Sequence, residues 1–278
     1  NFIMVFVKHS INQEVNIMKV TAFVGSAQRK HTYHAAELFL KNLSALGDIQ
    51  TELIVLSDYN LQHCRGCRLC LDKGEELCPL KDDRDLLFDK IRNSDGVVFA
   101  SPNYSFQVSG IMKVFFDRFG YMFHRPPFFG KSFTCIVTEG IYGGKKILEY
   151  INFFGYGLGF NTVKGSCITT VEPISADREK ENAAIIEKHA NKFYSQLNKN
   201  QYPSPSLFSL MMFRMARSSM KIMLSDDSPD YHYYNGNGWF KSDYYYPVNL
   251  NPFQRAAGKL FDKRVAYIAK TKGKVGFI

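Results

Sequence analysis

The sequence predicts an α/β fold in which a five-stranded parallel sheet is covered by helices on both faces. Short apolar runs rich in β-branched residues recur along the first 200 residues, stretches with helical spacing separate them, and polar or glycine-rich segments follow them. Right-handed crossovers place helices on both faces of such a sheet. The expected strands lie at 19–24, 53–56, 96–100, 133–137 and 160–165.

The expected helices alternate with these strands. A first helix is expected after the first strand, and Asp83 stands where it can cap a second helix. Further helices are expected around 111–119, 147–154, 176–197 and 252–270. Ligands of doubly wound sheets bind beyond the carboxyl ends of the strands, where the strand order reverses. The loops after the first, third and fourth strands are therefore the expected site.

Composition sets the broad class. The 278 residues are 45% hydrophobic and 22% charged, which excludes wholesale disorder, and the absence of a long uncharged apolar window excludes a membrane span. We divide the chain into an N-terminal extension (1–17), a principal domain (18–198) and a C-terminal extension (199–278). The apolar start lacks a basic leader and a cleavage site, so we expect a cytoplasmic protein.

The excess positive charge is concentrated near the C-terminus. Of the net +9, residues 201–278 carry +6, from eleven Lys and Arg against five Asp. The sequence has no zinc-finger, basic-zipper or RNA-recognition signature. We therefore expect a solvated basic face and no nucleic-acid partner.

The C-terminal extension has two interpretations. Arg214, Arg217 and Lys221 fall on one face of a Met-rich helix over 207–224, which is typical of a basic amphipathic helix. Such a helix could lie on a membrane surface, but Met-rich apolar stripes also pack adaptably against protein. We favour packing as a lid over the site or against a second subunit, and we expect a homodimer or a higher homo-oligomer.

The loop after the first strand favours a bound phosphate. Gly25 ends the strand, and the Ser26 and Thr32 hydroxyls and the Arg29 and Lys30 cations surround the start of the first helix. Free backbone N–H groups and the helix dipole favour an anion there. The glycine signatures of a P-loop and of a dinucleotide fold are absent after this strand. A solvated turn with incidental basic residues is the alternative.

The loops after the third and fourth strands suit a flat heteroaromatic ring. Residues 101–106 supply Pro, Tyr and Phe, and residues 138–144 supply three glycines. Aromatic side chains offer a flat partner, and glycine lets the backbone approach closely. Two ordinary turns are the alternative, but three such loops in three expected places favour a ligand.

At this point the sequence resembles the flavodoxin-like NAD(P)H-dependent FMN reductases, particularly the branch with iron-sulfur flavoproteins, over residues 18–167. The resemblance implies that the five expected strands lie in the order 2-1-3-4-5 in the sheet. The resemblance rests on Gly25-Ser26 with Arg29-Lys30 and Thr32, on Ser101-Pro102-Asn103-Tyr104 followed by Lys113 and Asp117-Arg118, and on a cysteine segment that ends in Lys81-Asp82-Asp83.

The resemblance implies FMN as the cofactor. Its phosphate is expected at Ser26, Arg29, His31 and Thr32, and its isoalloxazine ring between the two later loops. The full set of residues expected to bind it is Ser26, Gln28, Arg29, Lys30, His31, Thr32, Tyr33, Pro102, Asn103, Tyr104, Ser105, Phe106, Thr138, Glu139, Gly140, Tyr142 and Gly143.

Four cysteines cluster in the loop after the second strand. Cys64, Cys67, Cys70 and Cys78 fall within 15 positions, and a cytosolic location argues against a disulfide framework. A structural zinc site more often splits its ligands into separated pairs. Three thiolates at this spacing with a fourth nearby suit a [4Fe-4S] cluster, and the spacing resembles the compact motif of iron-sulfur flavoproteins. The cluster is the favoured interpretation, free thiols the second and zinc the third.

The resemblance implies an oxidoreductase that uses NAD(P)H as electron donor. Reduced nicotinamide passes hydride directly to flavin, so we expect no catalytic acid, base or nucleophile. The expected acceptor is a quinone, a nitro or azo compound, or a protein. The alternatives are an electron-transfer module that carries FMN and a cluster, and a thiol-based redox sensor. His124 and Arg125 are expected to meet a nicotinamide nucleotide or a facing subunit, or to cap a helix.

Overall fold

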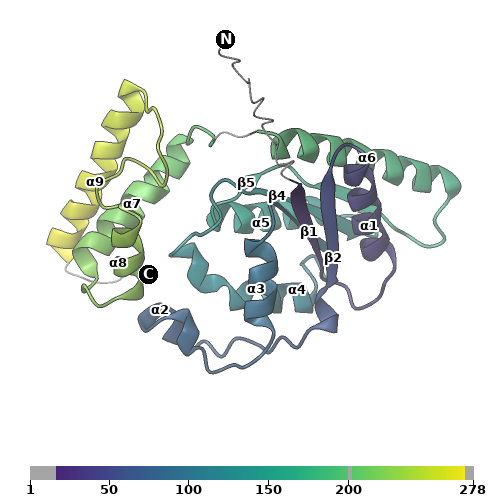
Figure 1. The fold of residues 1–278 in the computed structure, drawn as a ribbon, viewed down its shortest axis with the longest axis horizontal. Helices are drawn as coiled ribbons and strands as arrows, with labels where there is room; N and C mark the ends of the chain where they lie inside the picture. The colour runs from purple at the N-terminus through teal and green to yellow at the C-terminus, as the bar shows by residue number, and fades with distance from the viewer. Residues whose placement is uncertain (1–16, 200–201, 273–278) are drawn as a thin grey trace, which may run out of the picture.

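A parallel sheet lies at the centre of the principal domain. The computed structural model describes residues 17–199 and 202–272, so the expected N-terminal extension lies outside it except for Ile17. The sheet runs in the order β2-β1-β3-β4-β5, with β6 also paired to β4, and every pair is parallel. The expected fold class and order are confirmed (Figure 1). The strands are β1 (Met18–Val24), β2 (Ile49–Val55), β3 (Gly96–Pro102), β4 (Ser132–Glu139), β5 (Asn161–Thr162) and β6 (Ser166–Thr169).

The last strand departs from the expectation. In place of one strand over 160–165, the structure has the short strands β5 and β6, which pair with the beginning and the end of β4. Between them Gly165 lies against β4 so closely that a Cβ atom there would stand 2.3 Å from the Cys135 carbonyl oxygen. This close passage interrupts the pairing, and pairing resumes beyond the expected end of the strand.

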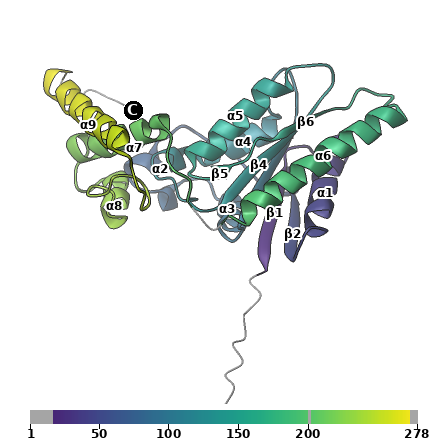
Figure 2. The same cartoon turned by 90° about the horizontal axis from the view of Figure 1, so that it is seen from above.

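Helices cover both faces of the sheet. Figure 2 shows α6 on one side of the strands and α4 and α5 on the other. One buried cluster joins α1 and α6 to β1, β3 and β4, and a second joins α3, α4 and α5 to the opposite face. The helices of the principal domain are α1 (His31–Ser44), α2 (Leu69–Asp72), α3 (Arg84–Arg92), α4 (Gly110–Arg118), α5 (Gly144–Gly157) and α6 (Ala176–Leu197), with 3₁₀ turns η1 (Leu56–Asp58), η2 (Glu75–Leu77) and η3 (Gly120–Phe123).

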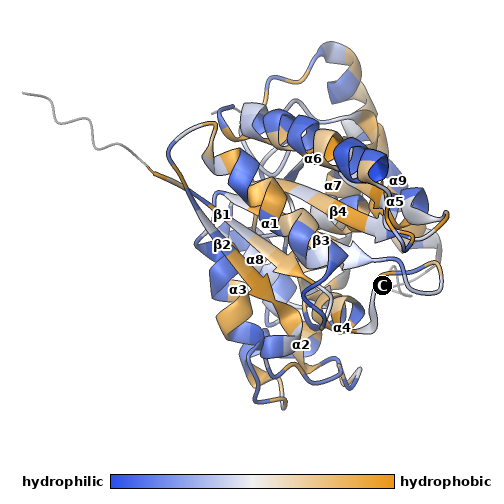
Figure 3. Cartoon of the chain, turned by 90° about the vertical axis from the view of Figure 1, so that its right-hand side faces the viewer, coloured by the Kyte–Doolittle hydropathy of each residue, from blue (hydrophilic) through white to orange (hydrophobic). Residues whose placement is uncertain are grey.

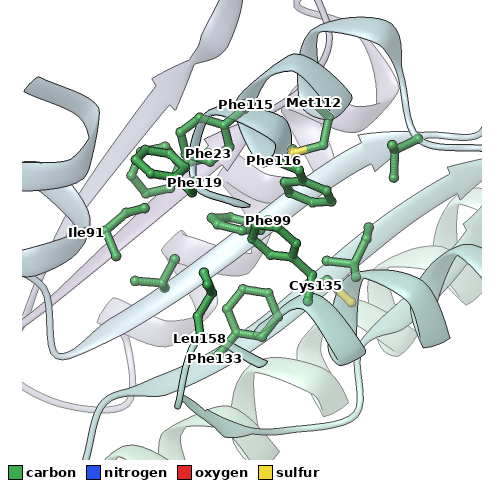
Figure 4. Packing of buried hydrophobic residues seen from close by; sticks show 14 of the residues in the cluster. Phe23, Ile91, Phe99, Met112, Phe115, Phe116, Phe119, Phe133, Cys135 and Leu158 are labelled. Carbon is green, nitrogen blue, oxygen red and sulfur yellow. The ribbon is translucent and has the colours of Figure 1, made fainter. Parts of the chain in front are cut away.

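Alternation along the strands explains this layering. In β3 every residue is buried, and Val98 and Ala100 face the α1 and α6 side while Val97 and Phe99 face the other. The ring of Phe99 packs edge-on against Phe133 at a centroid distance of 5.0 Å, within the group of aromatic rings drawn in Figure 4. The strands carry hydrophobic colour in Figure 3, and α6 and α1 turn hydrophilic residues outward. A sheet buried on both faces requires such apolar strands.

The second helix starts where expected, but its cap differs. Asp83 occupies the N-cap position of α3, yet its side chain makes no capping bond. Its carboxylate instead accepts a hydrogen bond from the backbone N–H of Asn60 at 2.7 Å, and its own N–H donates to the Asn60 carbonyl. The expectation that Asp83 caps this helix is therefore wrong, because a long-range pairing uses the carboxylate.

The C-terminal extension has a hydrophobic cluster of its own. Phe213 of α7 (Leu207–Met223), Tyr234 of α8 (Pro229–Gly236) and Trp239, which follows α8, belong to it, and α9 (Pro252–Lys272) packs on α7. No helix in the described parts of the chain combines the length and apolar character that a membrane crossing requires.

Arg214 and Arg217, on the expected basic face of α7, are turned into the extension and not toward solvent. The Arg214 side chain is 6% exposed and donates to Asp243 and Asp262. Arg217 also donates to Asp262, at 2.6 Å, whereas Lys221 is exposed. Helical spacing placed Arg214 and Arg217 on one face correctly, and both pair with carboxylates inside the extension. This pairing disagrees with the membrane-surface interpretation of α7 and agrees with the favoured one, packing against protein, whereas the role of a lid or subunit interface stays a prediction.

A buried histidine links the sheet to α6 and gives a pH-dependent prediction. His189 lies between the hydroxyls of Thr134, at 2.6 Å, and Ser166, at 2.8 Å. Burial, with a smaller contribution from Lys192, lowers the pKa of His189 from 6.5 to about 4. Between these two values the unfolded chain binds a proton that the folded protein does not, so folding stability decreases as the pH falls through this window.

We expect His189→Gln to remove this contribution. The free energy of unfolding, measured by urea denaturation, should fall from pH 7 to pH 4 by about 3 kcal/mol less in the variant than in the wild type. His34→Gln makes the same substitution at an exposed position of α1, and as the control it should change the free energy of unfolding at pH 7 by less than about 0.5 kcal/mol. Parallel pH profiles for His189→Gln and the wild type would contradict the prediction.

Candidate functional site

The start of α1 is an open anion-binding position. The Gly25 N–H donates to the Ala100 carbonyl at 2.8 Å, which carries the chain from β1 over the end of β3. Lys30 is the N-cap residue, no side chain caps the helix, and the first turn has no acidic residue. The uncapped N–H groups and the positive end of the dipole therefore remain available to an anion.

The loops after β3 and β4 meet this helix start. Pro102 pairs with Thr138 in the register of β3 and β4, and the Asn103 N–H donates to the Thr138 carbonyl at 2.8 Å. The Thr138 hydroxyl lies 2.7 Å from the buried Thr32 hydroxyl of α1. The three loops expected from the sequence thus converge at one edge of the sheet.

They enclose a cavity of about 200 Å³, which we call the strand-end pocket. The expected residues that line it come from all three loops. They are Ser26, Gln28, Lys30, His31, Thr32, Pro102, Asn103, Tyr104, Thr138, Glu139 and Gly140. Thr170 lines it as well and was missed, because it follows β6 and the last strand was expected to end five residues earlier.

The other expected residues lie outside this lining. Arg29 pairs with Asp58 at 2.9 Å and lies 5.8 Å from the ring of Tyr33. The structure therefore puts Lys30 and His31, and not Arg29, at the pocket. His31 Nε2 lies 2.8 Å from the Glu172 carboxylate. Ser105, Phe106, Tyr142 and Gly143 are placed beside the pocket.

These last four residues form part of an aromatic rim. Ser105 and Phe106 have φ values of 51° and 64°, which closes a tight turn in which Tyr104 and Gln107 exchange backbone hydrogen bonds. The Phe106 ring lies 5.3 Å from that of Tyr142. Both side chains are more than half exposed. Non-glycine residues rarely adopt such φ values, and strain of this kind concentrates at functional sites.

Gly143 is required by this packing. Its φ is +105°, and a Cβ atom would stand 2.9 Å from the Phe106 ring. Next to it, the Asn103 side-chain NH₂ donates to the Tyr142 carbonyl at 3.0 Å. The Asn103 Oδ1 atom is buried and has no donor among the residues that the structure describes. An unpaired buried acceptor in the pocket fits a ligand that donates a hydrogen bond.

These features fit FMN. The helix start with Lys30 and His31 suits a phosphate, and the Pro102–Tyr104 segment opposite Thr138–Gly140 offers two walls to a flat ring. In the second of these segments the Glu139 carboxylate accepts a hydrogen bond from the Gly144 backbone N–H at 2.6 Å. Burial and the adjacent Glu139 raise the pKa of the Cys167 thiol to about 12, so this cysteine stays protonated.

The four clustered cysteines lie in a second place, in the segment 60–83, which we call the cysteine loop. All four line one cavity of about 40 Å³ with Arg84 and Arg118. Cys64 and Cys67 are exposed, and Cys70 and Cys78 are half-buried. Burial, followed by the neighbouring Cys64, raises the pKa of the Cys70 thiol.

A buried ion pair closes the cysteine loop. Asp82 and Arg118 form a bidentate pair with side chains 1% and 2% exposed. Arg118 also donates to the Gln62 carbonyl at 3.0 Å, and Asp82 accepts from the Gln62 N–H at 2.9 Å. Arg118 further lies 3.9 Å from the Cys78 sulfur. The pair therefore joins both ends of the loop to the end of α4.

A second arginine joins the cysteine loop to the C-terminal extension. Arg125 follows η3, donates to the Cys70 carbonyl and pairs with Glu75 at 2.9 Å. Its Nε lies 3.0 Å from the buried Asp230 carboxylate of α8, which also accepts His124 at 2.8 Å. His124 and Arg125 thus connect parts of this chain. None of residues 202–272 lines the strand-end pocket.

The donor set of the cysteine loop fits an iron-sulfur cluster in its chemistry. Four thiols share one cavity. Two of the sulfurs also have a hydrogen-bond donor nearby: the Gly66 backbone N–H lies 3.4 Å from the Cys64 sulfur, and the Arg118 guanidinium lies 3.9 Å from the Cys78 sulfur. In residues 17–199 and 202–272 no three His, Cys, Asp or Glu side chains are already arranged as a metal site. The exposed segment with Cys64 and Cys67 would have to close over a cluster.

Comparison with known proteins defines the family. Residues 18–171 match the model of the NADPH-dependent FMN reductases, and the chain belongs to this family of flavin oxidoreductases. It is similar to an iron-sulfur flavoprotein of Archaeoglobus fulgidus, with 31% identity over 159 residues that cover 53% of this chain and 71% of that protein. An iron-sulfur flavoprotein of Clostridioides difficile is 28% identical over 222 residues, 77% of this chain and 94% of that one. The resemblance noted in the sequence is confirmed.

Solved structures with the same fold are more distant. The structure titled RosB with a bound 8-demethyl-8-formylriboflavin-5'-phosphate intermediate superposes with a TM-score of 0.53 at 14% identity and covers 65% of this chain and 79% of its own. A flavone reductase superposes with a TM-score of 0.52 at 16% identity, over 67% of this chain and 66% of its own. At these identities the likeness establishes the shared flavodoxin-like fold.

We expect Asp82→Asn to destabilise the protein strongly. Removal of one partner leaves the buried Arg118 charge uncompensated, which costs about 3–5 kcal/mol of unfolding free energy in chemical denaturation. Burial opposes ionisation of Asp82, but hydrogen bonds from Arg118 and from two backbone N–H groups hold its pKa below 3.8. The stabilisation is therefore present above about pH 4 and is lost as the pH falls through the folded pKa.

Asp89→Asn is the matched control. Asp89 pairs with Arg92 at 3.3 Å on the exposed face of α3, and its loss should cost less than about 1 kcal/mol. Equal stability losses in the two variants would show that the Asp82–Arg118 pair does not support the cysteine loop.

Proposed function

We propose that the chain is an FMN-dependent NAD(P)H oxidoreductase that delivers electrons to a quinone, a nitro or azo compound, or a protein acceptor. The observation that carries the proposal is the meeting of three strand-end loops at the uncapped start of α1, in a family of FMN reductases. Bound FMN would supply hydride acceptance and electron release.

The residues of the chain would bind and orient the cofactor. Lys30, His31 and the N–H groups of α1 would hold the phosphate, and the Asn103 oxygen would accept a hydrogen bond from the ring. Tyr104 and Phe106 are each 58% exposed at the mouth of the pocket. A ring that packs against them would be shielded from water on one side, which leaves the other side for nicotinamide or acceptor.

Lys30→Glu tests the phosphate position. Titration of the apoprotein with FMN, followed by flavin fluorescence, should give a dissociation constant at least about tenfold higher in the variant, because the reversed charge repels the phosphate. Riboflavin, which has no phosphate, should bind both proteins alike. Lys41→Glu makes the same change of charge at the far end of α1 and should bind FMN normally.

The functional test is reduction of the flavin-loaded protein under anaerobic conditions. Addition of NADH or NADPH should bleach the flavin absorbance of the wild-type and Lys41→Glu proteins. A protein that binds neither flavin, or whose bound FMN stays oxidised with both nucleotides, would contradict the proposal.

The second candidate is an electron-transfer protein with FMN and a [4Fe-4S] cluster. It is favoured by the cavity that all four clustered cysteines share and by the cationic Arg118 beside Cys78. Cys64, Cys67, Cys70 and Cys78 would hold the cluster, which would supply one-electron transfer.

Cys78→Ser separates the two candidates. Protein purified without air should show broad absorption near about 400 nm in addition to the flavin bands, and the variant should lose only the broad absorption. Cys167→Ala, outside the cysteine loop, is the control and should retain both features. Flavin bands alone in the wild type would favour the first candidate, and zinc or thiol oxidation without iron would exclude the cluster.

A further inference from the structure

Helix α9 carries an exposed apolar stripe along its outer side. Phe253, Leu260 and Tyr267 recur every seven residues and are 68%, 65% and 68% exposed. Seven residues are close to two turns of an α-helix, so the three side chains stay on one side over about 21 Å. Large exposed apolar side chains in a row mark an interaction surface.

Cations flank this stripe, and no acid does. The exposed cations of α9 are spread along the helix, whereas its one acidic residue, Asp262, turns inward. There it accepts hydrogen bonds from Arg214 at 3.0 Å, from Arg217 at 2.6 Å and from Ser218 at 2.8 Å. The charged side chains exposed on α9 are therefore all cations: Arg255, Lys259, Lys263, Arg264 and Lys270.

The helix lies where a flat surface can reach it. Figures 1 and 2 both place α9 at the end of the molecule opposite α1 and β2. Its inner side packs on α7, with Val265 fully buried and Gly258 against the Arg214 guanidinium. The α7–α9 pair thus leaves the outer side of α9 uncovered by any described part of the chain.

We propose that α9 docks on the surface of an anionic lipid bilayer. Apolar and aromatic side chains in a line would enter the boundary between headgroups and acyl chains, and the flanking cations would contact lipid phosphates. The inference goes beyond the proposed redox activity, since α9 contributes nothing to the strand-end pocket. It assigns an amphipathic surface to α9 in place of α7, whose Arg214 and Arg217 are paired inside the extension.

Charge argues against a second copy as the occupant. Two α9 helices placed face to face would bring five cations from each side together with no acid to offset them, and like charges in contact oppose association. An acidic protein would match the charge, but the described surface of α9 is a narrow ridge of three side chains. A narrow apolar ridge flanked by cations suits a deformable lipid surface better than a shaped protein partner.

Vesicle flotation of the full chain tests the proposal. The wild type should float with vesicles of phosphatidylcholine mixed with phosphatidylglycerol and remain behind with phosphatidylcholine alone. Binding should fall as salt is raised from about 0.1 M to 1 M, since ions screen the surface charge.

Variants on the ridge give the specific readout. Leu260→Glu should weaken binding at least roughly tenfold, and the double reversal Lys259→Glu with Lys263→Glu should do the same. Ala256→Leu adds an apolar side chain beside the ridge and should strengthen binding by about threefold, which misfolding could not produce.

Matched controls lie elsewhere on the surface. Leu86→Glu changes an exposed leucine of α3, and Lys180→Glu with Lys188→Glu makes the same change of net charge on α6. Both should bind vesicles as the wild type does, and all variants should keep flavin reduction by NAD(P)H, so a failure here is distinguishable from failure of the proposed activity.

Any of five results would overturn the proposal. Three are no flotation with anionic vesicles at low salt, equal losses in ridge and control variants, and equal binding to neutral vesicles. The fourth is a wild type that does not float and that changes from dimer to monomer on Leu260→Glu, which would assign the ridge to an interface between copies. Stronger binding to polyglutamate than to anionic vesicles would likewise point to an acidic protein.

Discussion

Parallel pairing of β1, β3 and β4 is the constraint on which the candidate site depends. Because each crossover helix returns the chain to the same edge of the sheet, the loops after Val24, Pro102 and Glu139 all begin side by side. The strands are buried on both faces over most of their length, and only their last residues, Pro102 in β3 and Thr138 and Glu139 in β4, reach the pocket. Binding groups are therefore confined to the strand ends and the first residues beyond them, where Ser26 and Asn103 meet the start of α1. The pocket follows from topology, and the loop residues decide what it binds.

The cysteine loop has no such regular support and depends on buried charge. Arg118 and Arg125 reach it from the end of α4 and from the second residue after η3, and each pairs with a buried carboxylate. A buried charge is tolerated only with a partner, so these contacts specify one arrangement of an otherwise irregular segment. Arg125 contacts both the Cys70 carbonyl and Asp230 of α8. The position of the cysteines is thereby tied to the sheet on one side and to the C-terminal extension on the other.

The sequence predicts the regular elements and most of the pocket because both follow from local pattern and topology. Ser26 and Pro102 at strand ends, and Thr32 at the start of α1, are found without any knowledge of distant contacts. The errors arise where a long-range partner competes with a local rule. Asp83 has the position of a cap but binds the Asn60 backbone. The expected role of Arg29 at the phosphate stays a prediction, and in the structure Arg29 pairs with Asp58. Thr170 was missed because Gly165 interrupts the last strand against the Cys135 carbonyl, which no local pattern reveals.

The same distinction explains the charge of the C-terminal extension. Helical spacing shows which cations share a face, but only tertiary contacts show whether that face is paired. On α7 the face turns inward to Asp243 and Asp262, and the pairing consumes the only acid of α9. Among the residues that the structure describes, the exposed cations of α9 have no carboxylate partner, and they stand next to large exposed apolar side chains. Packing of the extension does not require either feature on the outer side of α9, since Val265 and Gly258 already make its contact with α7. An exposed arrangement that folding does not need is best explained by contact with something outside the chain.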